Sequence, residues 1–424
     1  MSPIIIIGAG ASGLMAARIL AEKGHKVTVV EGRDRVGGRI HAIQEDFSIP
    51  IEAGAEFMHG RQALTLALIK ESKSELSQLS GSRYQFWNGN IQQGNYFDDG
   101  WDLLAMQLER LGKDTTMGDV LDTYFNKDEY RNLRKKVRAF VEGYDAADIN
   151  QVSALALKQE WEEGDDEHQY HIRGGYSKLI YFLLGKIRAS GGEVFLNEPV
   201  EEIQWTPGQV KVTTKSGYVY EGGRAIITVP LGVLQKGVIR FSPPLPDHDT
   251  AFTNIGFGGV IKFFIEFRDS FWEDINSRDL KDVAFIFSDA RIPTWWSQLP
   301  ERAPLLTGWL GGPPTFKIPT EREALFQMAL DSLAYIFHCT EATLRNEIVK
   351  WQVVDWVKDP FANGAYAYPM VQSHQAVKFI TKPVNGTLYF AGEAFYAGPS
   401  MGMVEAALVS GRDVSDRLSA ENPK

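Results

Sequence analysis

Residues 4–13 of the chain read IIIIGAGASG, and this stretch decides the fold of the N-terminal region. Four consecutive isoleucines are typical of a buried strand, and apolar residues recur at helical spacing from Leu14 to Glu22. Gly24 then ends the predicted helix, and residues 27–30, VTVV, predict a second strand. The segment is therefore interpreted as a βαβ unit with a glycine-rich first turn.

Each glycine of this turn has its own physical reason. Gly8 permits a tight turn, Gly10 lets the backbone approach a pyrophosphate, and Gly13 allows the helix to pack closely on the strand. The helix N-terminus, which contains Ser12, stabilises the phosphate charge. Glu31 ends the second strand, where it would accept hydrogen bonds from ribose hydroxyls and repel the 2'-phosphate of NADP. The segment predicts a site for FAD or NAD.

Residues 31–39, EGRDRVGGR, extend the nucleotide site. Gly38, with the glycine before it, allows close backbone approach, and Arg39 and Arg33 supply positive charge beside a pyrophosphate. A large, doubly charged FAD diphosphate can use both features. The pattern Glu-x3-Arg-x-Gly-Gly-Arg resembles the second motif of the flavoprotein group that contains the amine oxidases, phytoene desaturases and protoporphyrinogen oxidases.

The chain resembles flavin-containing amine oxidases over nearly its whole length, in several separate segments. Residues 54–60, GAEFMHG, are similar to the stretch that passes beside the flavin ring, and residues 173–176, RGGY, to the return into the FAD domain. Residues 228–234 resemble a family strand and turn, and residues 390–393 with 402–407 resemble the C-terminal flavin motif. The resemblance adds these cofactor-binding residues: Gly54, Ala55, Glu56, Phe57, Val200, Trp356, Gly392, Glu393, Met403 and Val404.

Lys262 interrupts the apolar stretch GFGGVIKFF at residues 256–264. A lysine is costly to bury without a partner, so its charge either has a buried partner or reaches outward from an edge strand. The resemblance places at this position the family lysine that holds a water against flavin N5. Lys262 is therefore expected to be catalytic if it is buried.

Two further catalytic residues follow from the resemblance. Tyr366 falls where the family presents an aromatic ring at right angles to the flavin, as one wall of an amine cage. His59 matches a histidine of the polyamine oxidases, although a histidine beside a glycine can equally be structural. Ala365 stands where the monoamine oxidases carry the cysteine bound to the flavin, so FAD is expected to be non-covalent. Met403 stands in place of their second cage tyrosine, with the register of the loop at 393–403 left open.

The chain is expected to have an α/β fold with two domains, because 424 residues exceed the roughly 250 to 300 at which single cores stop growing. A discontinuous, Rossmann-like FAD-binding domain is predicted from residues 1–80, 171–246 and 360–424. A second, α+β substrate-binding domain is predicted from residues 81–170 and 247–359.

Helical spacing also predicts several helices outside the N-terminal unit. They are expected over residues 63–79, 101–146, 321–337, 341–349 and 402–418. The acidic run at residues 160–167 is interpreted as a helix end and solvated loop, in preference to a rim that attracts substrate.

Composition limits the partners and the setting of the protein. A net charge of -10 argues against nucleic acid. Cys339 is the one cysteine, so no intrachain disulfide can form. No stretch approaches the roughly 18 apolar residues of a membrane helix, and the N-terminal isoleucines are too few for a signal peptide. A soluble, cytoplasmic protein without a metal site is expected, and its oligomeric state stays open.

The resemblance implies an FAD-dependent amine oxidase that oxidises a C–N bond of a polyamine or another amine and reduces O2 to H2O2. His59 favours polyamines, and Trp295 and Trp296 are further candidates for the cage, although such tryptophans are more often core.

An L-amino acid oxidase is the nearest alternative, but the sequence places no arginine for its carboxylate. A carotenoid- or protoporphyrinogen-type desaturase is a weaker alternative, since no apolar membrane-facing stretch is found. A flavin-binding module without activity would lack Lys262 and Tyr366. A histone demethylase is not expected, because the sequence leaves no room for its accessory domain and helical insertion.

Overall fold

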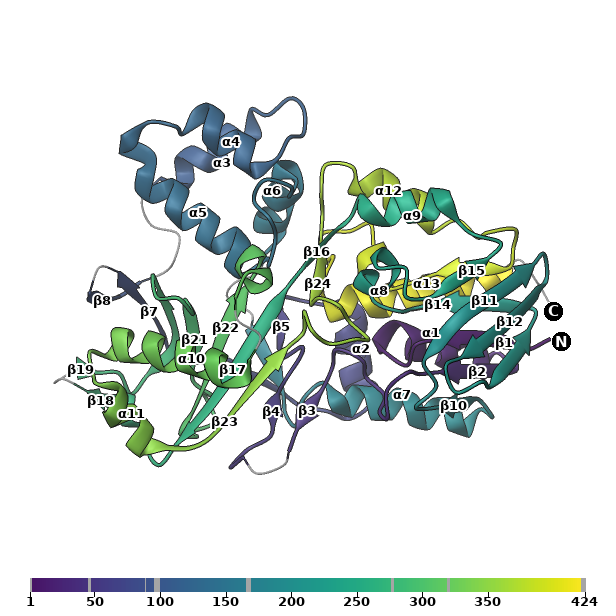
Figure 1. The fold of residues 1–424 in the computed structure, drawn as a ribbon, viewed down its shortest axis with the longest axis horizontal. Coiled ribbons are helices and arrows are strands. Elements are labelled where there is room, and N and C mark those ends of the chain that lie inside the picture. The colour runs from purple at the N-terminus through teal and green to yellow at the C-terminus, as the bar shows by residue number, and fades with distance from the viewer. Residues whose placement is uncertain are drawn as a thin grey trace.

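The computed structural model describes residues 2–44, 47–87, 89–94, 100–164, 169–275, 278–318 and 321–420. Figure 1 shows a parallel sheet with its helices on the right, a larger mixed sheet on the left, and a group of helices above the larger sheet. The chain passes between the two sheets several times, so each is assembled from segments far apart in the sequence.

The parallel sheet is built around the N-terminal strand. Its order is β10 (Glu193–Phe195), β2 (Val27–Val30), β1 (Ile4–Ile7), β14 (Arg224–Ile227) and β25 (Leu388–Phe390). Every neighbouring pair is parallel. The predicted βαβ unit and the Rossmann-like character of this sheet are therefore confirmed.

Alternate isoleucines of β1 enter different hydrophobic cores because successive side chains of a strand point to opposite faces. Ile4 and Ile6 pack with α1 (Ala11–Glu22), α7 (Ser177–Ala189) and α13 (Val404–Ala420). Ile5 and Ile7 pack with the four-stranded sheet and helices on the opposite face. Burial on both faces explains why β1 is apolar at every position.

The elements on that opposite face form a smaller layer. The four-stranded sheet contains β13 (Val219–Gly222), β12 (Gln209–Thr214), β11 (Val200–Thr206) and β15 (Arg240–Ser242). The helices are α8 (Leu231–Gln235), α9 (Pro246–Thr253) and α12 (Ser373–Ile380).

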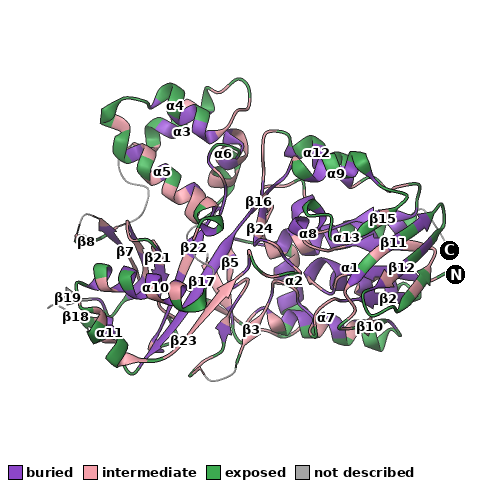
Figure 2. Cartoon of the chain, in the orientation of Figure 1, coloured by how far each residue is buried: buried purple, intermediate pink, exposed green. Residues whose placement is uncertain are grey.

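The larger sheet is mixed and has seven strands. Its order is β23 (Ile348–Asp355), β17 (Val260–Phe267), β22 (Leu305–Gly311), β21 (Thr294–Trp296), β20 (Val283–Ser288), β7 (Ser82–Trp87) and β8 (Asn90–Gln93). Helices α10 (Arg322–Phe337) and α11 (Glu341–Glu347) cover one face through a shared core. Figure 2 shows β17 buried along its length, so Lys262 lies on a central strand and not on an edge.

Four helices form a separate core above this sheet (Figure 1). They are α3 (Trp101–Glu109), α4 (Met117–Tyr124), α5 (Arg131–Gly143) and α6 (Ala154–Glu163). The remaining elements are short. They are α2 (Ala63–Glu71); the strands β3 (Ala42–Ile43), β4 (Ile51–Glu52), β5 (Phe57–His59), β6 (Leu76–Gln78), β9 (Gln169–Ile172), β16 (Gly256–Gly258), β18 (Asp274–Ile275), β19 (Arg278–Asp279) and β24 (Tyr366–Tyr368); and 3-10 turns at Asp128–Tyr130, Phe271–Glu273, Pro313–Phe316 and Glu393–Phe395.

Two predicted helices were too long. The helix expected over 63–79 ends at Glu71, and Leu76–Gln78 form β6, which pairs with β9. The helix expected over 341–349 ends at Glu347, and β23 begins at the next residue. In both cases apolar residues that fit helical spacing instead take part in strand pairing, which the local pattern does not reveal. Among the described residues, no helix is both long and apolar enough to cross a membrane.

Candidate active site

A cavity of about 770 Å³ is lined by residues of both sheets and of the helices above them. All but one of the predicted site residues line it: Gly8, Gly10, Ser12, Glu31, Arg33, Gly38, Arg39, Gly54, Ala55, Glu56, Phe57, His59, Val200, Lys262, Trp356, Tyr366, Gly392, Glu393, Met403 and Val404. The exception is Gly13, whose predicted part was helix packing. The structure therefore brings the predicted nucleotide residues and the predicted catalytic residues to one continuous space.

At one end of the cavity, the first turn of α1 follows the glycine-rich loop. A Cβ added to Gly13 would lie 2.0 Å from the Gly8 carbonyl oxygen, so only glycine permits this contact between helix and strand. A Cβ added to Gly10 would meet no atom within 4 Å, which leaves its backbone open to the cavity. The buried Ser12 hydroxyl has no hydrogen-bond partner among the described residues. Space, an unsatisfied hydroxyl and a helix N-terminus together fit a bound pyrophosphate.

Glu31 is held in place by backbone groups. Its carboxylate accepts hydrogen bonds from the backbone N–H of Ala9 at 2.7 Å and of Arg33 at 2.9 Å. Burial raises the pKa of Glu31, while these two hydrogen bonds act in the opposite direction. A carboxylate accepts about four hydrogen bonds, so acceptor sites remain for the ribose hydroxyls of a nucleotide.

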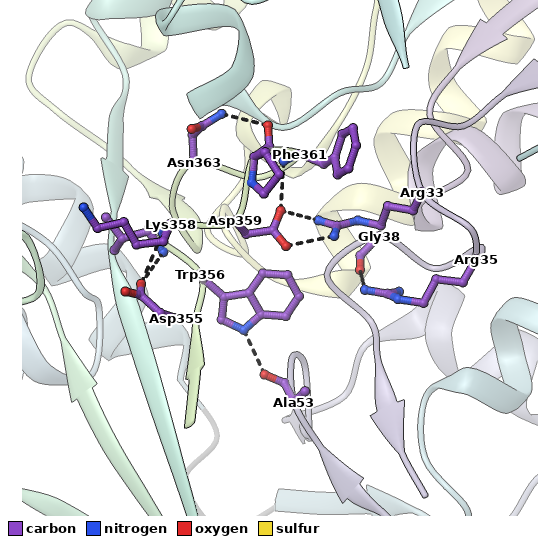
Figure 3. A network of polar contacts seen from close by, with 12 residues as sticks. Arg33, Arg35, Gly38, Ala53, Asp355, Trp356, Lys358, Asp359, Phe361 and Asn363 are labelled. Atoms are coloured by element: carbon purple, nitrogen blue, oxygen red, sulfur yellow. Dashed lines mark hydrogen bonds and ion pairs between the residues drawn. The ribbon is translucent and has the colours of Figure 1, made fainter. Parts of the chain in front are cut away.

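Arg33 joins the nucleotide loop to the segment that leads to Tyr366 (Figure 3). Its guanidinium donates two hydrogen bonds, of 2.8 and 2.6 Å, to the Asp359 carboxylate. It also lies 5.2 Å from the centroid of the Phe361 ring and 5.9 Å from that of Trp356. The positive charge of Arg33 is thus paired with Asp359, a residue that no sequence motif had indicated. Arg33 is placed to hold the two segments together as well as to line the cavity.

A second arginine connects the N-terminal and C-terminal motifs. Arg39 Nη1 donates to Glu393 Oε1 at 2.7 Å and to the Ala365 carbonyl at 2.5 Å. Glu393 Oε2 also accepts from the backbone N–H of Ala367 at 3.3 Å. These contacts fix the backbone on both sides of Tyr366, which begins β24.

Lys262 is deeply buried, with 1% of the side chain exposed. Its ammonium donates to Glu56 Oε2 and to the Glu52 carbonyl, both at 2.6 Å, with the Gly54 carbonyl at 3.4 Å. The indole N–H of Trp296 donates to the other oxygen of Glu56 at 2.9 Å. The alternative in which Lys262 reaches outward to solvent is excluded.

Tyr366 forms part of an aromatic wall. Its ring lies 6.4 Å from that of Trp309, with 26° between the planes, and its hydroxyl donates to the Tyr144 carbonyl at 2.5 Å. Burial, and then the charges of Asp145 and Glu160, raise the pKa of the Tyr366 phenol well above its usual value. The ring therefore presents a neutral face to the cavity.

His59 lies on β5 beside the same wall. Its Nδ1 is 3.4 Å from the Tyr144 hydroxyl. Burial, with a smaller contribution from the charge of Arg83, lowers the pKa of His59 to about 4. His59 is thus neutral at pH 7, and can both donate and accept hydrogen bonds.

The structure also reveals two carboxyl groups that the sequence interpretation missed. Asp145, just after α5, and Glu160, on α6, both line the cavity. Burial raises the pKa of Asp145 well above its usual value and that of Glu160 to about 7. Asp145 Oδ2 has no hydrogen-bond partner among the described residues. This pair, with one unsatisfied oxygen on Asp145, suits a cationic nitrogen.

For Glu160, the interpretation as part of a solvated loop was wrong, whereas Glu162 and Glu163 are exposed as expected and residues 165–168 lie outside the described residues. Glu160 follows the buried, cavity-lining Leu157 by three positions on a helix, and this spacing was an available signal. Of the two candidate tryptophans, Trp296 lines the cavity, whereas Trp295 is wholly buried in the core.

The prediction that FAD is bound non-covalently agrees with the residues that line the cavity. Ala365 lines the cavity, and Cys339 does not. No cysteine sulfur is therefore available there for a covalent bond. No group of three or more histidine, cysteine or carboxylate side chains in the described part of the chain is arranged to hold a metal ion.

The chain is similar to known proteins along its whole length. The sequence profile described as flavin containing amine oxidoreductase matches residues 11–419. The chain is 28% identical to lysine-specific histone demethylase 1 homolog 3 of Arabidopsis thaliana, over 92% of the chain but only 28% of that protein. It is 27% identical to polyamine oxidase 4 of Oryza sativa subsp. japonica, over 97% of the chain and 88% of that protein.

A redesigned putrescine oxidase has the same fold, with a TM-score of 0.82 at 19% identity over 99% of both chains. At this identity the likeness supports the architecture alone. Identity to the two sequence relatives is nearly equal, so it does not choose between their substrates.

Proposed function

The chain belongs to the flavin containing amine oxidoreductase family, and we propose that it is an FAD-dependent oxidase for an amine that carries a further cationic nitrogen, as polyamines do. The observation that carries this proposal is the carboxyl pair of Asp145 and Glu160 in the same cavity as Lys262 and Tyr366, where Asp145 Oδ2 is buried without a hydrogen-bond partner among the described residues. FAD, when bound, would accept a hydride equivalent from the carbon next to the amine nitrogen and pass the electrons to O2, giving an imine and H2O2.

The residues of the chain would divide the remaining work. Gly8, Gly10, Ser12 and Glu31 would hold the nucleotide part of FAD. Tyr366 and Trp309 form an apolar wall that orients the reacting amine and excludes water. Asp145 and Glu160 would bind a second, protonated nitrogen by charge-assisted hydrogen bonds.

The charges in the cavity argue against the desaturase alternative. A polyene substrate has no group to pair with Asp145, Glu160 or Arg83, all of which line the cavity. A polyene would leave the Arg83 charge desolvated, at a cost of several kcal/mol, of the order found for an unpaired buried ion, and would leave the polar carboxyl groups of Asp145 and Glu160 unpaired.

Anaerobic mixing of the FAD-loaded protein with an amine panel tests the proposal. The panel contains spermine, spermidine, their N-acetyl forms, benzylamine, tyramine and L-amino acids, and loss of the oxidised flavin absorbance is followed. Di- and polyamines are expected to bleach the flavin at lower concentration than benzylamine or tyramine. The Glu160→Gln variant should lose this preference, whereas Glu163→Gln, an exposed residue at the C-terminal end of α6, should keep it. No bleaching by any amine would contradict amine oxidation, and equal bleaching by mono- and polyamines would contradict the second cationic nitrogen.

A further inference from the structure

Arg83 is a charged residue of the cavity wall that none of the preceding interactions uses. It lies on β7, where it is the register partner of Phe285 on β20. Tyr84 and Phe86 on β7 pack into the core under α10, so the alternation of the strand directs Arg83 to the opposite face. Arg83 and Phe285 both line the cavity, in agreement with this alternation.

Among the described residues, the Arg83 guanidinium has no hydrogen-bond or ion-pair partner, unlike the other arginines of the cavity. Arg33 is paired with Asp359 and Arg39 with Glu393. Within the described ranges of the chain, no hydrogen bond or ion pair involves the Arg83 side chain, although the residue is partly buried. A guanidinium removed from water loses hydration, and this loss is offset only when an acceptor takes its place. The absent acceptor is therefore expected to come from a ligand.

His59 and Gln169 are neutral residues of the cavity wall and do not compensate the charge of Arg83. The Phe57 ring lies 5.7 Å from that of Phe285, the register partner of Arg83, and 6.1 Å from that of His59, so Arg83 and His59 belong to the same part of the cavity wall. In agreement, the charge of Arg83 contributes, after burial, to the lowered pKa of His59. Gln169 is the register partner of His59 on β9 and also lines the cavity. Because His59 is neutral, this wall keeps the single positive charge of Arg83.

The carboxyl pair comes from other elements than Arg83. Asp145 follows α5 and Glu160 lies on α6, whereas Arg83 lies on β7, and all three residues line the cavity. The cavity wall thus contains carboxyl groups contributed by the helical region and a guanidinium contributed by the larger sheet. A ligand that satisfies both carries an ammonium and an anion.

We propose that Arg83 binds a carboxylate of the amine substrate, so that the enzyme takes amines that also bear a carboxylate group. The planar guanidinium offers five N–H donors in a fixed fork that matches the two oxygens of a carboxylate. His59, in the same part of the cavity wall, can donate a further hydrogen bond. The inference rests on the proposed amine oxidation for its substrate class, but the carboxylate site itself can be measured without any reaction.

Calorimetric titration of the FAD-loaded protein tests the site. The probes are non-reacting alkanoates from propanoate to octanoate, and the ω-amino carboxylates of the same lengths, with the matching n-alkylamines for comparison. Wild type should bind at least one carboxylate of each series. Arg83→Met should weaken that binding at least about tenfold, which is about 1.4 kcal/mol, and leave alkylamine affinity within about twofold. Arg83→Lys should bind carboxylates more tightly than Arg83→Met but less tightly than wild type. The exposed control Arg240→Met should bind them as wild type does.

The outcomes separate the two proposals. If no carboxylate binds wild type, or if Arg83→Met binds carboxylates as wild type does with unchanged melting temperature, the carboxylate site is wrong. If carboxylates bind through Arg83 but no amine bleaches the flavin, the amine oxidase proposal fails and the site stands.

Discussion

The Lys262 ammonium lies 2.6 Å from Glu56 Oε2, and only 1% and 5% of the two side chains are exposed. Such a pair is maintained because neither charge can reach water, and each is further satisfied by a fixed group. Two backbone carbonyls accept from Lys262, and the Trp296 indole donates to Glu56. The pair joins β17 of the larger sheet to the loop before β5, so it fixes the charged lysine in the cavity wall.

Substituting one partner of the Lys262–Glu56 pair should destabilise the protein more than substituting both partners together. Glu56→Gln leaves a buried ammonium without a counter-charge, and we expect it to lower the free energy of unfolding by about 3–5 kcal/mol. Lys262→Met should cost a similar amount by stranding the carboxylate. The double variant should recover part of the loss, which denaturant unfolding of all four proteins would show. Strictly additive losses would mean that the two charges do not interact.

Lys262→Met should also alter the reaction while the cofactor stays bound. The residue lines the cavity but makes no contact with Gly8, Gly10 or Glu31, so the purified protein should remain yellow and FAD-loaded. We expect flavin reduction or reoxidation, measured separately by stopped flow, to slow on the order of a hundredfold. Lys211→Met, an exposed lysine on β12, is the control. Unchanged rates for both half-reactions would remove Lys262 from the mechanism.

The affinity for a diamine should rise with pH through the titration of Glu160. Burial raises the pKa of Glu160 to about 7, so the group is neutral below this pH and negatively charged above it. Alkylammonium groups stay protonated over pH 6 to 8. The KM for a diamine should therefore fall by about tenfold across this range, the size of one charge-assisted hydrogen bond. Glu160→Gln should flatten this dependence, and a monoamine should not show it. A KM that rises from pH 6 to 8 would contradict the assignment.

The sequence predicted the parts of the site that depend on backbone geometry. The turn at Gly8 to Gly13 and the strand of Lys262 are set by local constraints, namely close approach and continuous burial. It did not predict Asp145, Glu160 or Arg83, because a charged residue on an amphipathic element looks solvated until tertiary packing encloses its face. The partner of Arg33 was missed for a related reason, since Asp359 lies far away in the sequence and only the fold brings the two together.

The Arg33–Asp359 pair should contribute to FAD binding. Its two hydrogen bonds tie the 31–39 loop to the segment before Tyr366. Arg33→Ala should loosen this loop and weaken FAD binding by about tenfold, measured by flavin fluorescence on reconstitution of the apoprotein. Arg33→Lys should bind FAD little more tightly than Arg33→Ala, because an ammonium cannot make the bidentate contact. Arg188→Ala, exposed at the end of α7, should have no effect. If Asp359→Asn binds FAD as tightly as wild type, the Arg33–Asp359 pair does not contribute to FAD binding.

Two glycines of the first turn should respond to alanine in opposite ways. At Gly13 the added methyl would lie 2.0 Å from the Gly8 carbonyl oxygen and 2.7 Å from the Thr228 hydroxyl, so α1 must move off the sheet. We expect Gly13→Ala to lower the free energy of unfolding of the apoprotein by at least about 3 kcal/mol. At Gly10 the backbone is extended, with φ -76°, and no protein atom lies within 4 Å of the added methyl. Gly10→Ala apoprotein should therefore be as stable as wild type.

The effect at Gly10 should instead appear when FAD is added. The methyl would occupy the open space beside the helix N-terminus, which is the space that a pyrophosphate needs. We expect Gly10→Ala to weaken FAD binding on the order of a hundredfold, about 2.7 kcal/mol, with the melting temperature of the apoprotein unchanged. Normal FAD affinity in a folded Gly10→Ala protein would place the pyrophosphate elsewhere. Loss of apoprotein stability would instead mean that the loop packs against protein atoms at this position, so the two measurements distinguish a cofactor contact from a packing contact.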